Sequence, residues 1–131
     1  MELTTELSML LWVTGLTLLM WVPYIGVRLL THGMIPALTY KTDHLPVADW
    51  AERAKKAHYN AIENLIPFAV VVFIASHMGA TNGATAAAAT AYFWFRAAHY
   101  VLYVMNVPFG RTLTFAGGWF ATACIFYQIV A

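Results

Sequence analysis

The hydropathy pattern divides the chain into four long apolar stretches separated by short polar segments. We expect helices over residues 7–30, from Val47 or Ala48 to about His77, over 84–105, and over 111–130. Each stretch is long enough to cross a hydrocarbon core of about 30 Å at about 1.5 Å per residue. The sequence therefore predicts an all-α integral membrane protein, a four-helix bundle forming a single domain over residues 1–131.

Proline and glycine refine these boundaries. Pro23 lies inside the first stretch, where a residue without a backbone N–H is expected to kink the helix. A polar loop is expected over residues 31–50, and tight turns over 79–83 and 106–110. Gly79 and Gly83 match the G-x-x-x-G pattern but lie outside an apolar run, so they indicate a turn. The alanine run at 86–89 favours close helix packing.

Composition supports the membrane assignment. Hydrophobic residues make up 61% of the 131 residues and charged residues 10%, whereas soluble domains carry about 25% charged residues. The net charge of +1 gives no indication of a nucleic-acid partner. Cys124 is the only cysteine, which excludes a disulfide framework within one chain, and no close ligand spacing indicates a metal site. The acidic start and the length of the first apolar stretch favour a retained span over a signal peptide.

Positive charges lie next to only two of the connections between the expected helices. The seven Lys and Arg residues are Arg28, Lys41, Arg53, Lys55, Lys56, Arg96 and Arg111. The positive-inside rule then places the 31–50 loop and the 106–110 turn in the cytoplasm and both termini outside. Short loops and the lack of an endoplasmic-reticulum retention tail favour a bacterial inner membrane.

The second expected helix carries a polar stripe. Its members recur at intervals of three or four residues, which places them on one helix face: Arg53, Lys56, Asn60, Glu63 and Pro67. Glu63 lies ten residues past Arg53, or about 15 Å along the axis, which is about halfway into the hydrocarbon. A charge at that depth is costly unless it faces protein or water, so Glu63 is a functional candidate.

Other expected helices contribute polar groups at the same level. Arg96, His99 and Tyr103 share one face of the third helix, Arg28 ends the first, and Arg111 with Thr112 opens the fourth. We predict one shared polar site, the alternative being unrelated anchors at the membrane interface. His99 as a structural hydrogen-bonding residue and Tyr103 as an interfacial aromatic remain open alternatives.

The charge balance of this site indicates its ligand class. The site would hold four cations (Arg28, Lys56, Arg96 and Arg111) against one buried carboxylate, that of Glu63. This set suits a ligand with several carboxylates or phosphates and one amine, because arginine binds carboxylates with paired hydrogen bonds. Free backbone N–H groups at the start of the fourth helix would favour an anion and ease ionisation of a thiol. A second, apolar substrate could arrive through the bilayer.

Three motifs, in order along the chain, carry a resemblance to a known family. They are Glu52-Arg53-x-x-Lys56-Ala57-His58-x-Asn60-x-x-Glu63 with Pro67-Phe68, then Arg96-x-x-His99-x-x-x-Tyr103, then Pro108-x-x-Arg111-Thr112. Together they resemble the helix signatures of the MAPEG superfamily, the membrane-associated proteins in eicosanoid and glutathione metabolism. Gly26-x-Arg28 is similar to the end of its first helix, so the resemblance covers all four expected spans.

The resemblance implies a homotrimer that binds glutathione as co-substrate between subunits near the cytoplasmic face. Such enzymes conjugate glutathione to lipophilic electrophiles, reduce lipid hydroperoxides or isomerise a prostaglandin endoperoxide. Arg111 and Thr112 would be catalytic and stabilise the thiolate, and Glu63 would take the amino group. The implied glutathione-binding residues are Arg28, Lys56, Asn60, Glu63, Arg96, His99 and Tyr103.

Departures from the family pattern leave other functions open. Lys56 and Tyr59 stand where prostaglandin-forming members often have arginine, and Phe115 replaces an expected tyrosine, which argues against prostaglandin-type specificity. Glu63 could instead lock helices by pairing with Arg96 or Arg53. A non-catalytic lipid-binding or scaffolding protein of this fold is the main alternative. A transporter with Glu63 as proton carrier is less favoured, since no polar route leads outside.

Overall fold

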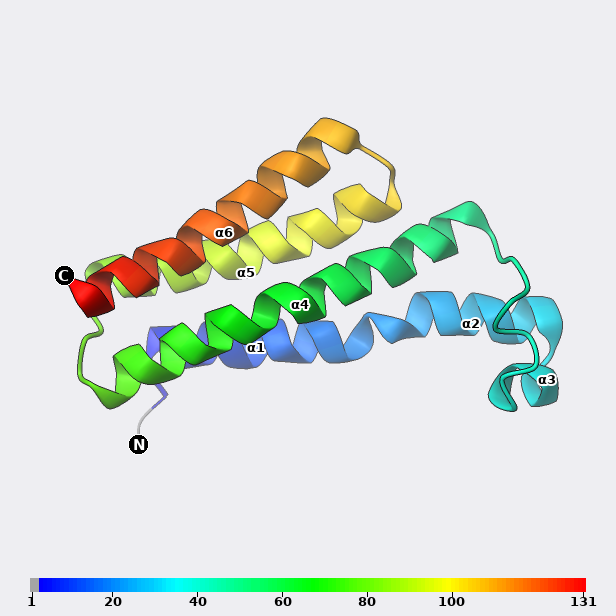
Figure 1. Ribbon diagram of the computed structural model, residues 1–131, viewed down its shortest axis with the longest axis horizontal. Helices are drawn as coiled ribbons and strands as arrows, with labels where there is room; N and C mark the ends of the chain where they lie inside the picture. The colour runs from blue at the N-terminus through cyan, green and yellow to red at the C-terminus, as the bar shows by residue number, and fades with distance from the viewer. Residues whose placement is uncertain (1–2) are drawn as a thin grey trace.

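The computed structural model describes residues 3–131 and contains helices without any strand in that range. The helices are α1 (Thr5–Leu19), α2 (Trp21–His32), α3 (Met34–Leu38), α4 (Asp49–His77), α5 (Gly83–Val104) and α6 (Pro108–Val130). α1 and α2 form one long rod, which lies side by side with the rods α4, α5 and α6 (Figure 1). The all-α prediction is confirmed.

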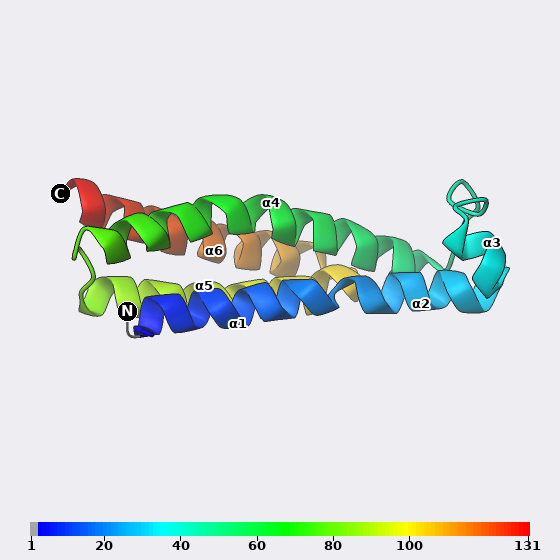
Figure 2. The same ribbon diagram turned by 90° about the horizontal axis from the view of Figure 1, so that it is seen from below.

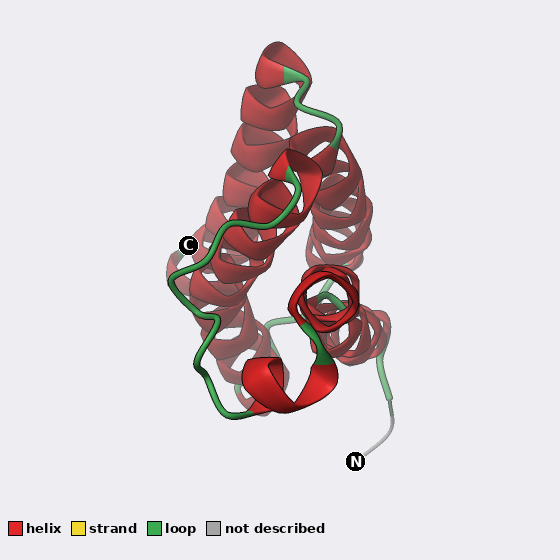
Figure 3. Ribbon diagram, turned by 90° about the vertical axis from the view of Figure 1, so that its right-hand side faces the viewer, coloured by secondary structure: helices red, strands yellow, loops and turns green. Residues whose placement is uncertain are grey.

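The two ends of the molecule differ in construction. The described N-terminal residues, the C-terminus and the α4–α5 turn lie together at one end, which we call the terminal end (Figure 1). At the other end, which we call the α3 end, α2 reaches past α5 and α6 and carries α3 (Figure 2). Viewed from this end, α3 and the loop after it fold back toward α4 (Figure 3).

The break between α1 and α2 follows from a proline. Pro23 has no N–H to donate to the carbonyl of Leu19, so one hydrogen bond of the helix is missing there. The helix is interrupted at Met20, whose N–H turns to the carbonyl of Thr17 at 3.2 Å. The predicted disruption of the first span by Pro23 is confirmed.

The helix starts are capped as their sequences require. The Thr4 hydroxyl accepts a hydrogen bond from the N–H of Leu7 at 3.3 Å, and Asn82 forms a reciprocal capping box with Thr85. α6 begins at Pro108, whose lack of an N–H costs nothing in the first turn of a helix. α6 therefore starts three residues before the predicted Arg111.

Two helices end in the left-handed conformation that a sharp turn needs. Gly79 has φ of 67°, and the N–H of Ala80 donates back to the carbonyl of Ala75. Asn106 has the left-handed conformation after the end of α5, with φ of 60°. The predicted turn at 79–83 is confirmed, with Gly83 already the first residue of α5, whereas the turn predicted over 106–110 is shorter, because residues 108–110 belong to α6. The predicted loop over 31–50 is partly wrong, because residues 34–38 form α3 and α4 begins at Asp49.

Small residues and one aromatic pair hold the rods together. The rings of Phe68 and Tyr92 stack between α4 and α5 with centroids 3.8 Å apart and planes 5° apart. Ala88 and Ala89 are buried, which confirms that the alanine run allows close packing. A Cβ at Gly118 would lie only 3.2 Å from the side chain of Arg96, so the glycine allows α6 to approach α5 closely.

Within residues 3–131, three segments are long and apolar enough to cross a membrane: Thr5–His32, Asp49–His77 and Pro108–Val130. Large apolar side chains on these helices point outward, among them Leu18, Phe73 and Phe120. Such faces suit lipid, because a soluble monomer rarely exposes extensive apolar patches. α5 has 22 residues and packs against α1, α4 and α6.

Candidate functional site

A cavity of about 190 Å³ opens near the α3 end, where α4, α5 and α6 meet. It is lined by Asn60, His99, Tyr103, Arg111, Thr112 and Phe115. Five of these six residues are site residues predicted from the sequence, and they come from three different helices. The cavity therefore brings together the core of the predicted constellation within a single chain.

Arg111 lies over an aromatic ring at the mouth of the cavity. Its guanidinium carbon is 4.6 Å from the ring centre of Tyr103, a distance typical of a cation–π contact. Tyr103 in turn meets His99 edge to face, with centroids 5.6 Å apart. Arg111 and His99 are thus held through Tyr103 on one side of the cavity.

Arg96 lies just behind this cavity and reaches it through Asn60. Its guanidinium Nη2 donates to the side-chain oxygen of Asn60 at 2.7 Å, joining α5 to α4. Arg96 is 2% exposed and does not line the cavity itself. The structure therefore places Arg96 as a support for Asn60.

Two buried nitrogens at this site have no hydrogen-bond partner among the described residues: Nδ1 of His99 and Nε of Arg96. Both side chains are almost wholly buried. Most buried polar groups in proteins are hydrogen-bonded, and an unpaired one costs about 1–3 kcal/mol. Unpaired polar groups in and behind a cavity are typical of a site that a ligand or ordered water completes.

The start of α6 differs from the prediction in a way that affects the chemistry. Because α6 begins at Pro108, the N–H of Arg111 is already bonded to the carbonyl of Val107 at 2.9 Å. The expectation that this N–H is free for an anion is wrong. The Thr112 hydroxyl donates to the carbonyl of Pro108 at 3.1 Å, so its proton is also in use.

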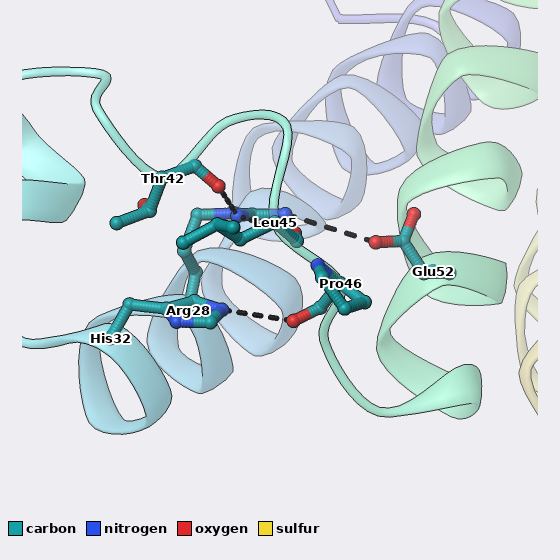
Figure 4. Close-up of polar contacts among 6 residues, drawn as sticks. All are labelled: Arg28, His32, Thr42, Leu45, Pro46 and Glu52. Carbon is teal, nitrogen blue, oxygen red and sulfur yellow. Dashed lines mark hydrogen bonds and ion pairs between the residues drawn. The ribbon is translucent and has the colours of Figure 1, made fainter.

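Arg28 lies away from this cavity. Its guanidinium donates to the carbonyls of Thr42 and Leu45 and forms an ion pair with Glu52 at 3.8 Å (Figure 4). Nearby, His32 bonds the carbonyl of Pro46 at 2.9 Å. Arg28 therefore ties the loop before α4 to α2, and within one chain it does not join the other predicted residues.

A second cavity, of about 310 Å³, surrounds Arg28. It lies between α2, α3 and the start of α4, and its polar lining includes Tyr24, Asp43, Lys55 and Tyr59. The α3 end therefore carries two separate polar cavities, one on each side of α4.

Lys56 and Glu63 are both exposed on the outer face of α4. The expected burial of Glu63 is therefore wrong for the single chain. Among residues 3–131, the one ion pair is that of Arg28 with Glu52, so the alternative pairing of Glu63 with Arg96 or Arg53 does not form within one chain. Arg53 donates instead to the carbonyl of Val104 at 2.9 Å, at the end of α5. Glu63 therefore needs a partner from outside the chain if it lies within a bilayer.

The family profile of the MAPEG family matches residues 7–131. The chain belongs to the MAPEG family. Comparison with curated proteins and with solved structures gave no significant match. The match confirms the resemblance seen in the motifs, and together with the apolar helices it makes this MAPEG chain an integral membrane protein.

Sequence reasoning missed several polar contacts of this MAPEG chain. The sequence indicated Glu52 only as part of a motif, whereas in the structure it forms an ion pair with Arg28. Asn64, one turn after Asn60, donates to its backbone carbonyl at 2.8 Å. Glu6 is 3% exposed and accepts a hydrogen bond from Thr85 at 2.5 Å. For Asn64, the i, i+4 spacing from Asn60 was a usable signal, whereas the Glu6–Thr85 pair spans 79 residues.

No metal centre is formed by the part of the chain that the structure describes. Within residues 3–131, no three His, Cys, Asp or Glu side chains lie close enough together to hold a metal ion. Cys124 packs at the edge of the apolar core.

Proposed function

We propose that this chain is a membrane-bound glutathione transferase or peroxidase of the MAPEG family. The observation that carries the proposal is the cavity between α4, α5 and α6, with Arg111 at its mouth and two unpaired buried nitrogens in and behind it. Glutathione offers two carboxylates, peptide carbonyls and a thiol, which match these donors. Its single amine matches the exposed carboxylate of Glu63.

Arg111 would stabilise the thiolate of bound glutathione. A nearby guanidinium favours the charged form of sulfur, and the thiol proton passes to water. The thiolate then attacks an electrophilic carbon, a carbon–sulfur bond forms, and the leaving group departs with the bonding electrons. With a hydroperoxide, the thiolate sulfur instead attacks the O–O bond, takes up one oxygen as a sulfenic acid and releases the alcohol. A second glutathione then displaces that oxygen as water and forms the disulfide.

Thr112 can assist only after a rearrangement. Its hydroxyl proton is bonded to the carbonyl of Pro108, so donation to a thiolate requires rotation about the side-chain bond. A rotation between staggered positions is available to an exposed threonine. Thr112 therefore ranks behind Arg111 in the proposed stabilisation of the thiolate.

The proposal includes a homotrimer, because the site of one chain is small. Small-molecule sites usually enclose about 300–1,000 Å³, whereas the α4–α5–α6 cavity has about 190 Å³. Packing the outer face of α4 against a second copy would also cover Lys56 and Glu63. Leaving such a charge toward lipid costs about 2.5–3.5 kcal/mol at the centre of a helix. The Arg28 cavity of a neighbour could then complete the site.

We further propose that α5 is the fourth membrane span. A helix of 22 residues is long enough to cross the hydrocarbon, and its neighbours α1, α4 and α6 shield its small residues. The distribution of positive charge supports termini outside and a site facing the cytoplasm, in a bacterial inner membrane. The lipophilic second substrate would enter from the bilayer, among membrane lipids.

Calorimetric titration of glutathione into the detergent-purified protein tests this proposal. We expect saturable heat and an ultraviolet thiolate band that grows with bound glutathione. Ophthalmic acid, which replaces the thiol with a methyl group, is the matched ligand control and should give heat without the band. Absence of heat with glutathione, together with no protection from thermal unfolding, would overturn the proposal.

A non-catalytic lipid-binding role on the same fold has one observation in its favour. Phe115 places an apolar ring in the cavity, 6.3 Å from the ring of His99. Turnover of chlorodinitrobenzene separates the two functions, because only the transferase consumes it. Binding of glutathione without turnover of this substrate or of a lipid hydroperoxide would favour the non-catalytic role.

A further inference from the structure

We propose that Asn64 and Arg96 act as a positioning pair that holds the side-chain amide of Asn60 with its NH₂ group toward the cavity. Asn60 then meets a ligand only as a hydrogen-bond donor. The ligand part of this inference rests on the proposed function, whereas the orientation of the amide is a property of the protein alone.

The contact with Arg96 fixes which end of the Asn60 amide faces α5. A guanidinium has donors and no acceptor, so the atom 2.7 Å from Arg96 Nη2 must be the oxygen of Asn60. Arg96 is almost completely buried and Asn60 half-buried, which strengthens this contact relative to one in water. Turning the amide over would bring its NH₂ against the guanidinium.

Asn64 reinforces the same orientation from one turn along α4. Its Nδ2 lies 2.8 Å from the backbone carbonyl of Asn60, which can only accept, so that atom of Asn64 is the NH₂ group. The same nitrogen lies 3.3 Å from the side-chain oxygen of Asn60. Arg96 and Asn64 together occupy both lone pairs of that oxygen.

The free part of the Asn60 amide is then its NH₂ group. Asn60 lines the cavity with Tyr103 and Arg111, and none of the described residues accepts a hydrogen bond from its Nδ2. A donor at this position selects a carboxylate or a carbonyl and disfavours an ammonium group. We infer that a carboxylate or peptide carbonyl of the ligand lies against Asn60, and that the ligand's amine lies elsewhere.

Asn64 is suited to a test because it also borders an apolar groove. This groove of about 350 Å³ lies between α4 and α6, and Asn64 lines it together with Pro67 and Trp119. Leucine branches at the same carbon as asparagine and suits an apolar surrounding, and the groove has room for its larger side chain, so Asn64→Leu should fold. Thr90→Val is the matched control, because Thr90 bonds only the carbonyl of Ala86 in its own helix.

The first experiment observes the side-chain NH₂ signals of ¹⁵N-labelled asparagine in ligand-free protein. The Asn60 signals, assigned by their loss in Asn60→Asp, should form one sharp pair in the parent protein. They should shift and broaden in Asn64→Leu and Arg96→Lys as the amide samples both orientations, and stay unchanged in Thr90→Val. Unchanged Asn60 signals in both variants would overturn the positioning role.

The second experiment is a double-mutant cycle on glutathione affinity. We expect Arg96→Lys to weaken binding about tenfold and Asn64→Leu about threefold, since each loses one hydrogen bond in the support of Asn60. In an Asn60→Ala background both effects should fall to within about twofold, because the group being positioned is gone. The thiolate formed per bound glutathione should not change in Asn64→Leu.

The two experiments separate this inference from the proposed function. Effects that stay fully additive with Asn60→Ala would show that Asn64 and Arg96 do not act through Asn60, and would overturn the inference while leaving glutathione binding intact. If the parent protein binds no glutathione, the proposed function fails. The NH₂ signals of the ligand-free protein then still decide the orientation of Asn60.

Discussion

Two polar clusters at opposite ends of the molecule differ in how completely they are bonded. At the terminal end, the Thr85 hydroxyl donates to Glu6 at 2.5 Å and accepts from the N–H of Asn82 at 2.7 Å. Asn82 accepts from the N–H of Thr85 and donates to Gln128. This terminal cluster joins α1, α5 and α6, and its side chains bond one another.

The cavity near the α3 end has the opposite property. His99 and Arg96 are as deeply buried as Glu6, yet each leaves a nitrogen unpaired among the described residues. Arg28, at the same end of the molecule, is paired with two carbonyls and Glu52. Burial alone therefore does not distinguish these charged and polar side chains, which differ instead in whether all their nitrogens and oxygens have partners.

Under the proposed function, we expect the bonded clusters to contribute stability and the cavity with unpaired groups to contribute ligand binding. A satisfied hydrogen bond stabilises a fold by about 1 kcal/mol, while an unpaired buried donor costs about 1–3 kcal/mol until a ligand accepts from it. Substitutions at the terminal cluster and at Arg28 should then lower the free energy of unfolding. Substitutions at the cavity should change the affinity for glutathione or the formation of its thiolate.

The largest expected effect is at Arg111. We expect Arg111→Ala to abolish the thiolate band of bound glutathione and to lower chlorodinitrobenzene turnover by about 10²–10³-fold, the usual loss when a charge-stabilising group is removed. Lys41→Ala, which removes an exposed loop cation, is the control and should leave both unchanged. An undiminished thiolate band in Arg111→Ala would place the stabilising charge on another residue.

Arg28 should show the next largest effect, on stability. Arg28→Ala leaves the carbonyls of Thr42 and Leu45 without their donor, and we expect a loss of about 2–3 kcal/mol in the free energy of unfolding. Thermal unfolding in detergent measures it, and Arg28→Lys should recover part of the loss. A variant as stable as the parent but unable to bind glutathione would assign Arg28 to the binding site instead.

A change at Thr85 should be smaller and confined to stability. Thr85→Val leaves the buried carboxylate of Glu6 without its donor, which we expect to cost about 2 kcal/mol while glutathione affinity stays the same. Thr85→Ser keeps the hydroxyl and is the matched control. A loss of glutathione affinity in Thr85→Val at unchanged stability would contradict the division between the two ends.

The smallest effect on stability is expected at His99. His99→Phe replaces a ring whose Nδ1 is unpaired with an apolar ring of similar shape, so unfolding should change by less than about 1 kcal/mol in either direction. Glutathione affinity should nevertheless fall about tenfold, because one hydrogen-bonding group for the ligand is lost. Large destabilisation with normal glutathione affinity would make His99 a structural residue.

The helices and their ends follow closely from local sequence. Pro23 removes one hydrogen bond and interrupts the first span, while Gly79 and Asn106 supply the positive φ at which α4 and α5 end. The spacing of Arg96, His99 and Tyr103 also placed these residues on one side of α5 before any packing was known. Such features depend on neighbours within a turn or two, so the chain encodes them directly.

Tertiary structure decided which polar groups are paired. Arg28 and Asn60 looked alike in sequence, as polar residues at one level of the membrane, yet the loop before α4 folds back onto Arg28 while Asn60 meets Arg96. Glu6 and Thr85 are 79 residues apart and touch only because α1 packs against α5. Local rules fixed the helices and their faces, but partners far apart along the chain depend on how the rods pack, because a hydrogen bond needs its two atoms within about 3 Å.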